Sequence, residues 1–159
     1  MALAHPEVGQ DAPDFTLTSH QDTEITLSQF RGQKNVILFF VRAPACWHCR
    51  EHVEQLGRLY DQYQSFNTEV LVVIDASAEE ARDYAKQTHA KFPVLANPGH
   101  TIYELYGLNK VFFFTSRSGS VVVDTQGKIS YMKSALITNA WLKESLEVLD
   151  HVKSLAQPV

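Results

Sequence analysis

Two cysteines, Cys46 and Cys49, stand three positions apart where an apolar run gives way to a helical pattern. The run, residues 36–40, reads VILFF, which is typical of a strand covered on both faces. After the cysteines, apolar side chains recur at the spacing of one helix face, at Val53, Leu56, Tyr60 and Tyr63. This order predicts a buried strand, a turn, a dithiol and a helix, with Cys46 at or beside the helix's first turn.

The start of a helix favours an anion, because the first N–H groups have no partner within the helix and the helix dipole is positive there. Neither Pro44 nor Ala45 has a side chain that can cap the helix. A Cys46 thiolate can accept those N–H bonds, which would lower its pKa below the free value of about 8.5. Cys49 can then attack a mixed disulfide formed at Cys46. The pair predicts thiol–disulfide exchange, with Cys46 attacking and Cys49 resolving.

Length and composition favour one globular domain. The 159 residues, 45% of them hydrophobic, suffice for one buried core, and we expect a single domain over residues 1–159 with its core at about 8–154. The chain has 14 basic and 18 acidic residues, a net charge of −4, and no basic run. The sequence therefore gives no electrostatic basis for binding nucleic acid or an anionic membrane.

The first 15 residues, MALAHPEVGQDAPDF, lack the basic and apolar regions of a signal peptide. No stretch approaches the roughly 20 apolar residues that cross a membrane. We therefore expect a soluble, cytoplasmic protein. Two closely spaced cysteines in a reducing compartment are more often catalytic or metal-binding than structural.

A metal site would recruit His52, and with it His48, to the two sulfurs. A structural zinc site needs four ligands, and no second C-x-x-C or H-x-x-x-H exists elsewhere in the chain. We expect no metal and no cofactor.

Local patterns predict the remaining elements of a mixed sheet covered by helices. The strands expected are 15–19, 24–27, 70–74, 120–124 and 128–131, the last two joined by a turn that contains Gly127. Ser28 is expected to cap a short turn, and Ser77 with Glu80 forms a capping-box pattern for a helix to about Gln87. A helical turn is expected over 101–106, and residues 111–114 can be strand or loop. Thr138 is expected to cap a last helix with one apolar face: Leu142, Leu146, Leu149 and Val152.

This order of elements resembles the thioredoxin fold, and four segments are similar to the redoxin branch of that fold. They are VGQDAPDFTL at 8–17, TLSQFRGQKNVILFF at 26–40, FPVLANPGHTIYELYGL at 92–108 and SVVVDTQGKI at 120–129. The branch includes alkyl hydroperoxide reductase/thiol-specific antioxidant (AhpC/TSA) proteins, bacterioferritin-comigratory proteins and membrane-tethered thiol reductases. The resemblance implies an α/β, thioredoxin-like fold with a mixed central sheet flanked by helices and an N-terminal β-hairpin extension. It also implies a redox enzyme recharged by a thioredoxin-like or other dithiol.

The sequence departs from both subfamily signatures. Peroxiredoxins carry P-x-x-x-T-x-x-C; counted back from Cys49, the threonine position holds Cys46 and the proline position Arg42. Without the peroxide-binding threonine, we expect slow peroxidase chemistry. The position of the thioredoxin cis-proline holds Ser118, and Arg117 lies one residue from the place where peroxiredoxins often have a supporting arginine.

Two residues separate the cysteines. We expect Trp47 to lie exposed as a contact for partner proteins; the alternative is a lid over the dithiol. A His48 imidazolium would stabilise a neighbouring thiolate, and the alternative is a solvated residue without effect.

Three functions remain open. The first is disulfide exchange on a protein substrate. The second is thiol-dependent peroxidase chemistry, in which a hydroperoxide oxidises one sulfur to a sulfenic acid and the other closes it into a disulfide. The third is a non-enzymatic redox-sensing module. A homodimer is also compatible with the sequence.

Overall fold

The computed structural model describes residues 6–108, 118–135 and 141–156, without the side chains of residues 135 and 141. The elements in chain order are β1 (Thr16–Ser19), β2 (Glu24–Thr26), the 3-10 helix η1 (Leu27–Phe30), β3 (Asn35–Phe40), α1 (Trp47–Ser65), β4 (Thr68–Ile74), α2 (Ala78–Gln87), β5 (Val94–Ala96), α3 (Thr101–Leu105), β6 (Ser118–Val123), β7 (Ile129–Ala135) and α4 (Trp141–Ala156). The predicted residues 111–114 and the predicted cap Thr138 lie outside the described residues.

The strands form one seven-stranded mixed sheet in the order β2-β1-β5-β4-β3-β6-β7. β4 runs parallel to both β3 and β5, and the other neighbours are antiparallel. The N-terminal hairpin of β1 and β2 joins the sheet through β5. The predicted mixed sheet with an N-terminal hairpin is therefore confirmed.

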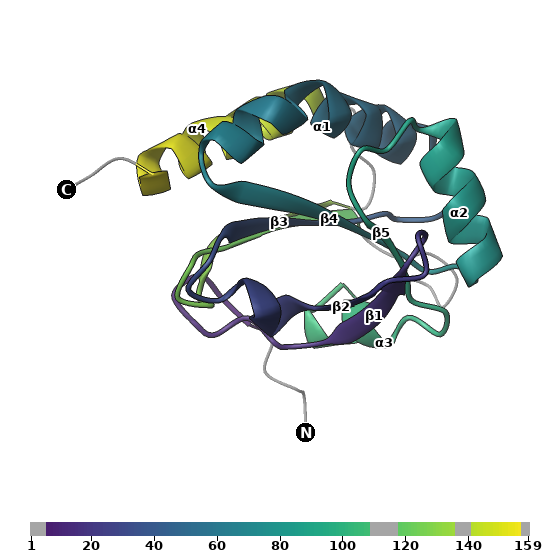
Figure 1. The fold of residues 1–159 in the computed structure, drawn as a ribbon, viewed down its shortest axis with the longest axis horizontal. Helices are drawn as coiled ribbons and strands as arrows, with labels where there is room; N and C mark the ends of the chain where they lie inside the picture. The colour runs from purple at the N-terminus through teal and green to yellow at the C-terminus, as the bar shows by residue number, and fades with distance from the viewer. Residues whose placement is uncertain (1–5, 109–117, 136–140, 157–159) are drawn as a thin grey trace.

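Alternate side chains of the central strands enter two cores, because successive residues of a strand point to opposite faces. Ile37 and Phe39 of β3 pack beneath α1, α2 and α4, which lie together above the sheet in Figure 1. Val36, Leu38 and Phe40 point to the other face, where α3 and η1 lie. All six residues of β3 are buried, as expected of a strand covered on both sides.

The predicted apolar face of the last helix is half wrong. Leu149 and Val152 are buried, but Leu142 is 49% exposed and Leu146 is 43% exposed. α4 instead turns a face containing Ser145 toward α1, where the Tyr63 hydroxyl donates to the Ser145 carbonyl at 2.9 Å. This orientation buries the charged residue Glu144.

The helix caps illustrate one confirmed and one wrong prediction. In α2 the Glu80 N–H donates to the Ser77 hydroxyl and the Ser77 N–H donates to the Glu80 carboxylate, both at 3.1 Å. This is the predicted capping box. The cap expected at Ser28 is wrong, because η1 already begins at Leu27 and the Ser28 N–H instead donates to Asp14 at 2.9 Å.

No helix in the described part of the chain is both long and apolar enough to cross a membrane.

Candidate active site

Cys46 is the N-cap residue of α1, at the end of the turn that follows β3. Its backbone is extended (φ −67°, ψ 111°), and its N–H donates to the Ala43 carbonyl at 2.9 Å. The Cys46 Sγ accepts the Cys49 N–H at 3.2 Å, so the sulfur occupies the place that a serine or aspartate oxygen usually takes. The predicted position of Cys46 at the start of the helix is confirmed.

Cys49 lies one turn into α1 and is held from the other side of the turn. The backbone N–H of Arg42 donates to the Cys49 Sγ at 3.3 Å. Cys49 is 1% exposed and Cys46 8% exposed, and both are free thiols in this structure. Cys46 is therefore the more accessible of the two sulfurs.

The two thiols have opposite tendencies to ionise. The pKa of Cys46 is lowered to about 5, first because the Cys49 thiol donates a hydrogen bond to its sulfur, and further by the Cys49 N–H and the Arg42 side chain. Burial opposes this shift. The same thiol–thiolate hydrogen bond, together with burial, raises the pKa of Cys49. Near neutral pH the site thus holds a Cys46 thiolate beside a Cys49 thiol.

The predicted supporting residues have different surroundings. Trp47 is 68% exposed, in agreement with a role as a contact residue rather than as a lid. His48 is half-buried, and its Nδ1 is buried without a hydrogen-bond partner in the described part of the chain. Arg117 lies outside the described residues, and Ser118 is buried at the start of β6.

Arg42 is a functional candidate that the sequence did not reveal. It follows β3 directly, and both its backbone and its side chain act on the dithiol, the backbone on Cys49 and the side chain on Cys46. The available signal was its place in the peroxiredoxin proline position, which predicted a loss rather than a new contact.

A buried polar cluster lies one turn behind Cys49. His52 is packed, with its ring 4.1 Å from that of Phe39. Its Nδ1 is 3.7 Å from the Glu144 Oε2, which accepts the Ser120 hydroxyl at 2.6 Å. Burial lowers the pKa of His52 to about 3 and raises the pKa of Glu144, so it favours the uncharged form of each.

A groove runs beside the dithiol between α1 and α2. Its lining residues are Trp47, Arg50, Glu51, Glu54, Arg58 and Gln87. Charges of both signs line it, and Glu54 pairs with Arg58 at 3.7 Å. The groove places an exposed indole and charged groups next to the attacking sulfur.

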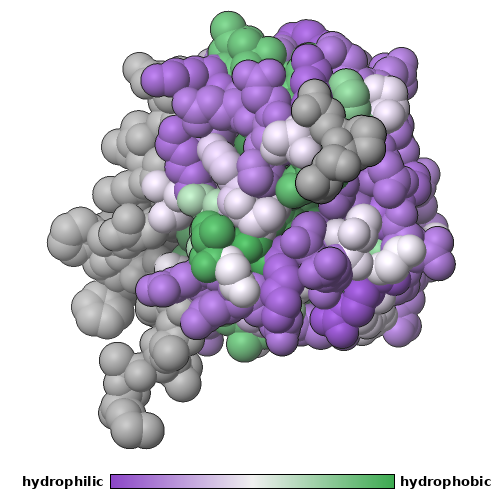
Figure 2. Space-filling view, turned by 90° about the vertical axis from the view of Figure 1, so that its left-hand side faces the viewer, coloured by the Kyte–Doolittle hydropathy of each residue, from purple (hydrophilic) through white to green (hydrophobic). Residues whose placement is uncertain are grey.

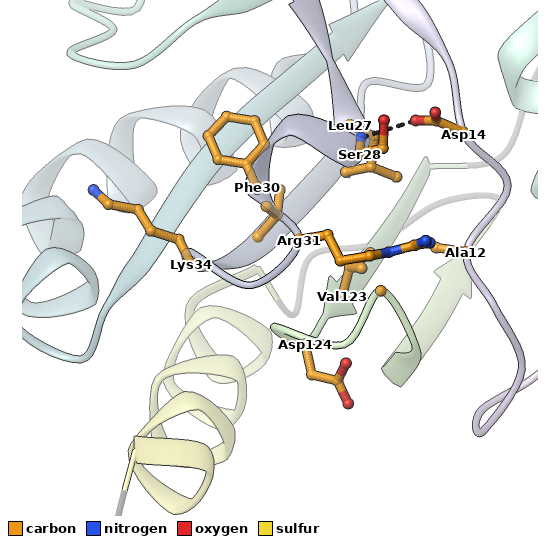
Figure 3. A pocket seen from close by; sticks show the side chains of 11 residues that line it. Ala12, Asp14, Leu27, Ser28, Phe30, Arg31, Lys34, Val123 and Asp124 are labelled. Atoms are coloured by element: carbon orange, nitrogen blue, oxygen red, sulfur yellow. Dashed lines mark hydrogen bonds between the residues drawn. The ribbon is translucent and has the colours of Figure 1, made fainter.

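A second hollow lies at the opposite end of the sheet, where β3 begins, and is separate from the dithiol (Figure 3). Its two carboxylates hold turns together. Asp14 accepts the Ser28 N–H, and Asp124 accepts the Gln126 N–H, each at 2.9 Å. This end of the molecule is mostly hydrophilic, with small hydrophobic areas (Figure 2). The two carboxylates of this hollow therefore have structural roles.

Within the described residues, no three His, Cys, Asp or Glu side chains gather closely enough to hold a metal ion.

Comparison with known proteins identifies the family to which this chain is similar. The model of the AhpC/TSA family matches residues 8–132. Thiol-disulfide oxidoreductase ResA of Bacillus thuringiensis subsp. konkukian is 29% identical over 126 residues, which cover 77% of this chain and 71% of ResA. Alkyl hydroperoxide reductase E of Mycobacterium bovis is 28% identical over 126 residues, which cover 78% of this chain and 82% of the reductase.

The fold is also that of solved redox proteins. The crystal structure of peroxidoxin BcpB from Mycobacterium tuberculosis is similar with a TM-score of 0.80 at 18% sequence identity, and the match covers 92% of this chain and 98% of that one. This likeness confirms the predicted thioredoxin-like fold.

Proposed function

Because the chain belongs to the AhpC/TSA family, we propose that it catalyses thiol–disulfide exchange, with Cys46 as the attacking thiolate and Cys49 as the resolving cysteine. Its relatives include thiol-disulfide oxidoreductases and peroxide reductases, so the chain is an oxidoreductase that acts on thiols, disulfides or peroxides. The choice among these substrates is the part that we propose.

The observation that carries the proposal is the asymmetry of the two sulfurs. Cys46 accepts the Cys49 N–H at the start of α1, and its pKa is lowered to about 5. A thiolate is the nucleophile in disulfide exchange, and Cys46 is the sulfur that the site keeps ionised.

The reaction then has two exchanges. The Cys46 thiolate attacks a substrate disulfide, an S–S bond forms at Cys46, and one substrate sulfur leaves as a thiolate that takes up a proton. Cys49 loses its proton and attacks the Cys46 sulfur. The bond to the second substrate sulfur breaks, that sulfur leaves with the electron pair, and the Cys46–Cys49 disulfide remains. An external dithiol must reduce this disulfide before the next turnover.

Peroxide reduction is the second candidate, favoured by the low pKa of Cys46 and by the likeness to alkyl hydroperoxide reductase E. There the thiolate would attack the O–O bond, release an alkoxide or hydroxide that is then protonated, and become a sulfenic acid. Cys49 would displace that hydroxyl as water to form the disulfide. Because a cysteine stands in the threonine position, the site has no hydroxyl there to hold and polarise the peroxide.

The partner is proposed from the site. A thioredoxin-like protein would present its dithiol to Cys46 and contact the exposed Trp47 beside the groove. We also propose a cytoplasmic location and a homodimer, for which cell fractionation and analytical ultracentrifugation, respectively, are the tests.

Stopped-flow kinetics distinguish the two reactions. Reduced protein is mixed separately with hydrogen peroxide and with a small disulfide, and the Cys46→Ser variant serves as the control for each. We expect a peroxide rate close to that of an ordinary low-pKa thiol and efficient reaction with the disulfide. A peroxide reaction much faster than the disulfide reaction would overturn the proposal in favour of a peroxidase.

A further inference from the structure

Tyr103, in the core on the far side of the sheet from α1, reaches the turn that holds Cys49. Its hydroxyl lies 2.7 Å from the Val41 carbonyl oxygen and 3.0 Å from the Val73 carbonyl oxygen. The Val73 oxygen already accepts the Val41 N–H at 2.9 Å. A tyrosine hydroxyl has one proton to donate, and the shorter contact identifies the Val41 carbonyl as its acceptor.

The Val41 carbonyl and the Arg42 N–H belong to one trans peptide group, in which they point in opposite directions. The carbonyl accepts the Tyr103 hydroxyl, and the N–H donates to the Cys49 Sγ at 3.3 Å. One peptide group therefore connects Tyr103 on one face of the sheet with Cys49 on the other.

Tyr103 is itself firmly held. It is fully buried, and the His100 ring stacks on it at 4.2 Å with an angle of 18° between the planes. The His100 ring is fixed at both nitrogens, 3.2 Å from the Asp75 carboxylate and 3.1 Å from the Leu108 carbonyl oxygen. The hydroxyl consequently has little freedom to leave the Val41 carbonyl.

We propose that Tyr103 is a positioning residue for Cys49: through the Val41–Arg42 peptide it aims and polarises the N–H that stabilises the Cys49 sulfur as a nucleophile. This inference rests on the proposed thiol–disulfide function. Hydrogen bonds in a chain strengthen one another, by roughly 10–30% per bond, so a donor on the carbonyl makes the Arg42 N–H a better donor. The stronger hydrogen bond assists the second exchange, in which Cys49 must carry negative charge.

The Tyr103→Phe variant removes the hydroxyl and keeps the ring. The Arg42 N–H favours the reduced state, because a thiol or thiolate sulfur accepts a hydrogen bond more strongly than a disulfide sulfur. The variant keeps the Arg42 N–H and weakens its bond by only a fraction, so we expect the equilibrium with glutathione to shift by up to about twofold toward the protein disulfide. We also expect slower release of substrate from the mixed disulfide at Cys46.

Tyr106→Phe is the matched control. Tyr106 is also buried, its ring centroid is likewise 5.2 Å from that of Phe40, and its hydroxyl donates to a backbone carbonyl, that of Pro13, at 2.6 Å. The control should lose stability as Tyr103→Phe does, without a change in the glutathione equilibrium. An equal shift in both variants, or no shift in Tyr103→Phe, would overturn the inference.

Two further results distinguish failure of the proposed function from failure of this inference alone. If the unaltered protein does not exchange with glutathione at all, the proposed function fails and the inference fails with it. If the unaltered protein exchanges and Tyr103→Phe exchanges identically, only the inference fails. If Tyr103→Phe does not fold, a fluorotyrosine at position 103 replaces it as the test. Its hydroxyl is more acidic and a stronger donor, so it must shift the glutathione equilibrium toward the dithiol. An unchanged equilibrium contradicts the role of Tyr103.

Discussion

The backbone N–H of Cys49 donates to the Sγ of Cys46 at 3.2 Å, so the resolving cysteine stabilises the attacking one through its main chain as well as through its thiol. Replacement of Cys49 by serine keeps this N–H, whereas replacement of Cys46 removes the nucleophile itself. The two variants therefore report on different steps of the reaction.

We predict that Cys46→Ser abolishes disulfide reduction and that Cys49→Ser accumulates a mixed disulfide with the substrate. Mass spectrometry of the protein after incubation with a small disulfide detects the trapped adduct. If Cys46→Ser keeps its turnover while Cys49→Ser is inactive, the roles are reversed and Cys49 is the attacking residue, as an alignment with peroxiredoxins would have it.

A second prediction compares Arg42 with His48. The Arg42 side chain contributes to the lowered pKa of Cys46, so Arg42→Met should raise that pKa above about 5 while leaving the backbone N–H to Cys49 in place. Arg42→Lys, which keeps the charge, should restore part of the effect. The measurement is a titration of thiolate ultraviolet absorbance in the Cys49→Ser background, where only one thiol is present. Cys49→Ser alone is the reference, because it lacks the Cys49 thiol that contributes most to the lowered pKa.

The sequence also predicts that His48→Ala raises the pKa of Cys46 and makes the couple more reducing, since a lower thiol pKa stabilises the dithiol. The same titration tests the pKa, and a glutathione equilibrium on the protein with both cysteines tests the couple. An unchanged pKa and an unchanged equilibrium would show His48 to be a neighbour without effect, and would leave Arg42 as the cation that matters.

The parts of the molecule that the sequence predicted depend on local chemistry. The apolar runs of β3 and β4, the Ser77–Glu80 capping box and the place of Cys46 before α1 all follow from residues that are close in the chain. The face of α4 does not, because it is decided by contacts with α1 and β6, where Ser120 makes a buried place for the Glu144 carboxyl. The link from Tyr103 to Cys49 depends on a peptide group whose two ends face opposite sides of the sheet, and no spacing in the sequence reveals it.

The capping box of α2 offers a stability test that leaves the two cysteines unchanged. Ser77→Ala removes the hydroxyl that accepts the Glu80 N–H and should lower the free energy of unfolding by about 1 kcal/mol. Ser65→Ala is the control, because Ser65 is exposed at the end of α1 and its hydroxyl donates to the nearby Gln62 carbonyl. Urea denaturation of both variants makes the comparison, and equal losses would contradict a special role for the cap.

The last prediction concerns the pH dependence of stability that His52 confers. Burial lowers its pKa from 6.5 to about 3, so between these values the unfolded chain binds a proton that the folded chain does not. Stability should therefore fall as the pH drops below 6.5, by about 2 kcal/mol between pH 7 and pH 5. His52→Gln cannot bind that proton and should lose this dependence.

Glu144 acts in the opposite direction and must be separated from His52. Its pKa is raised above 4.5 by burial, so its contribution to stability is present below 4.5 and is lost as the pH rises through its folded value. Glu144→Gln should abolish the stabilisation that Glu144 gives at low pH. The free energy of unfolding should then fall more steeply from pH 7 to pH 5 than in the unaltered protein. Urea unfolding at pH 5 and pH 7 on all three proteins gives the comparison. If His52→Gln keeps the full decline, then His52 is charged in the folded state and pairs with Glu144 across their 3.7 Å separation.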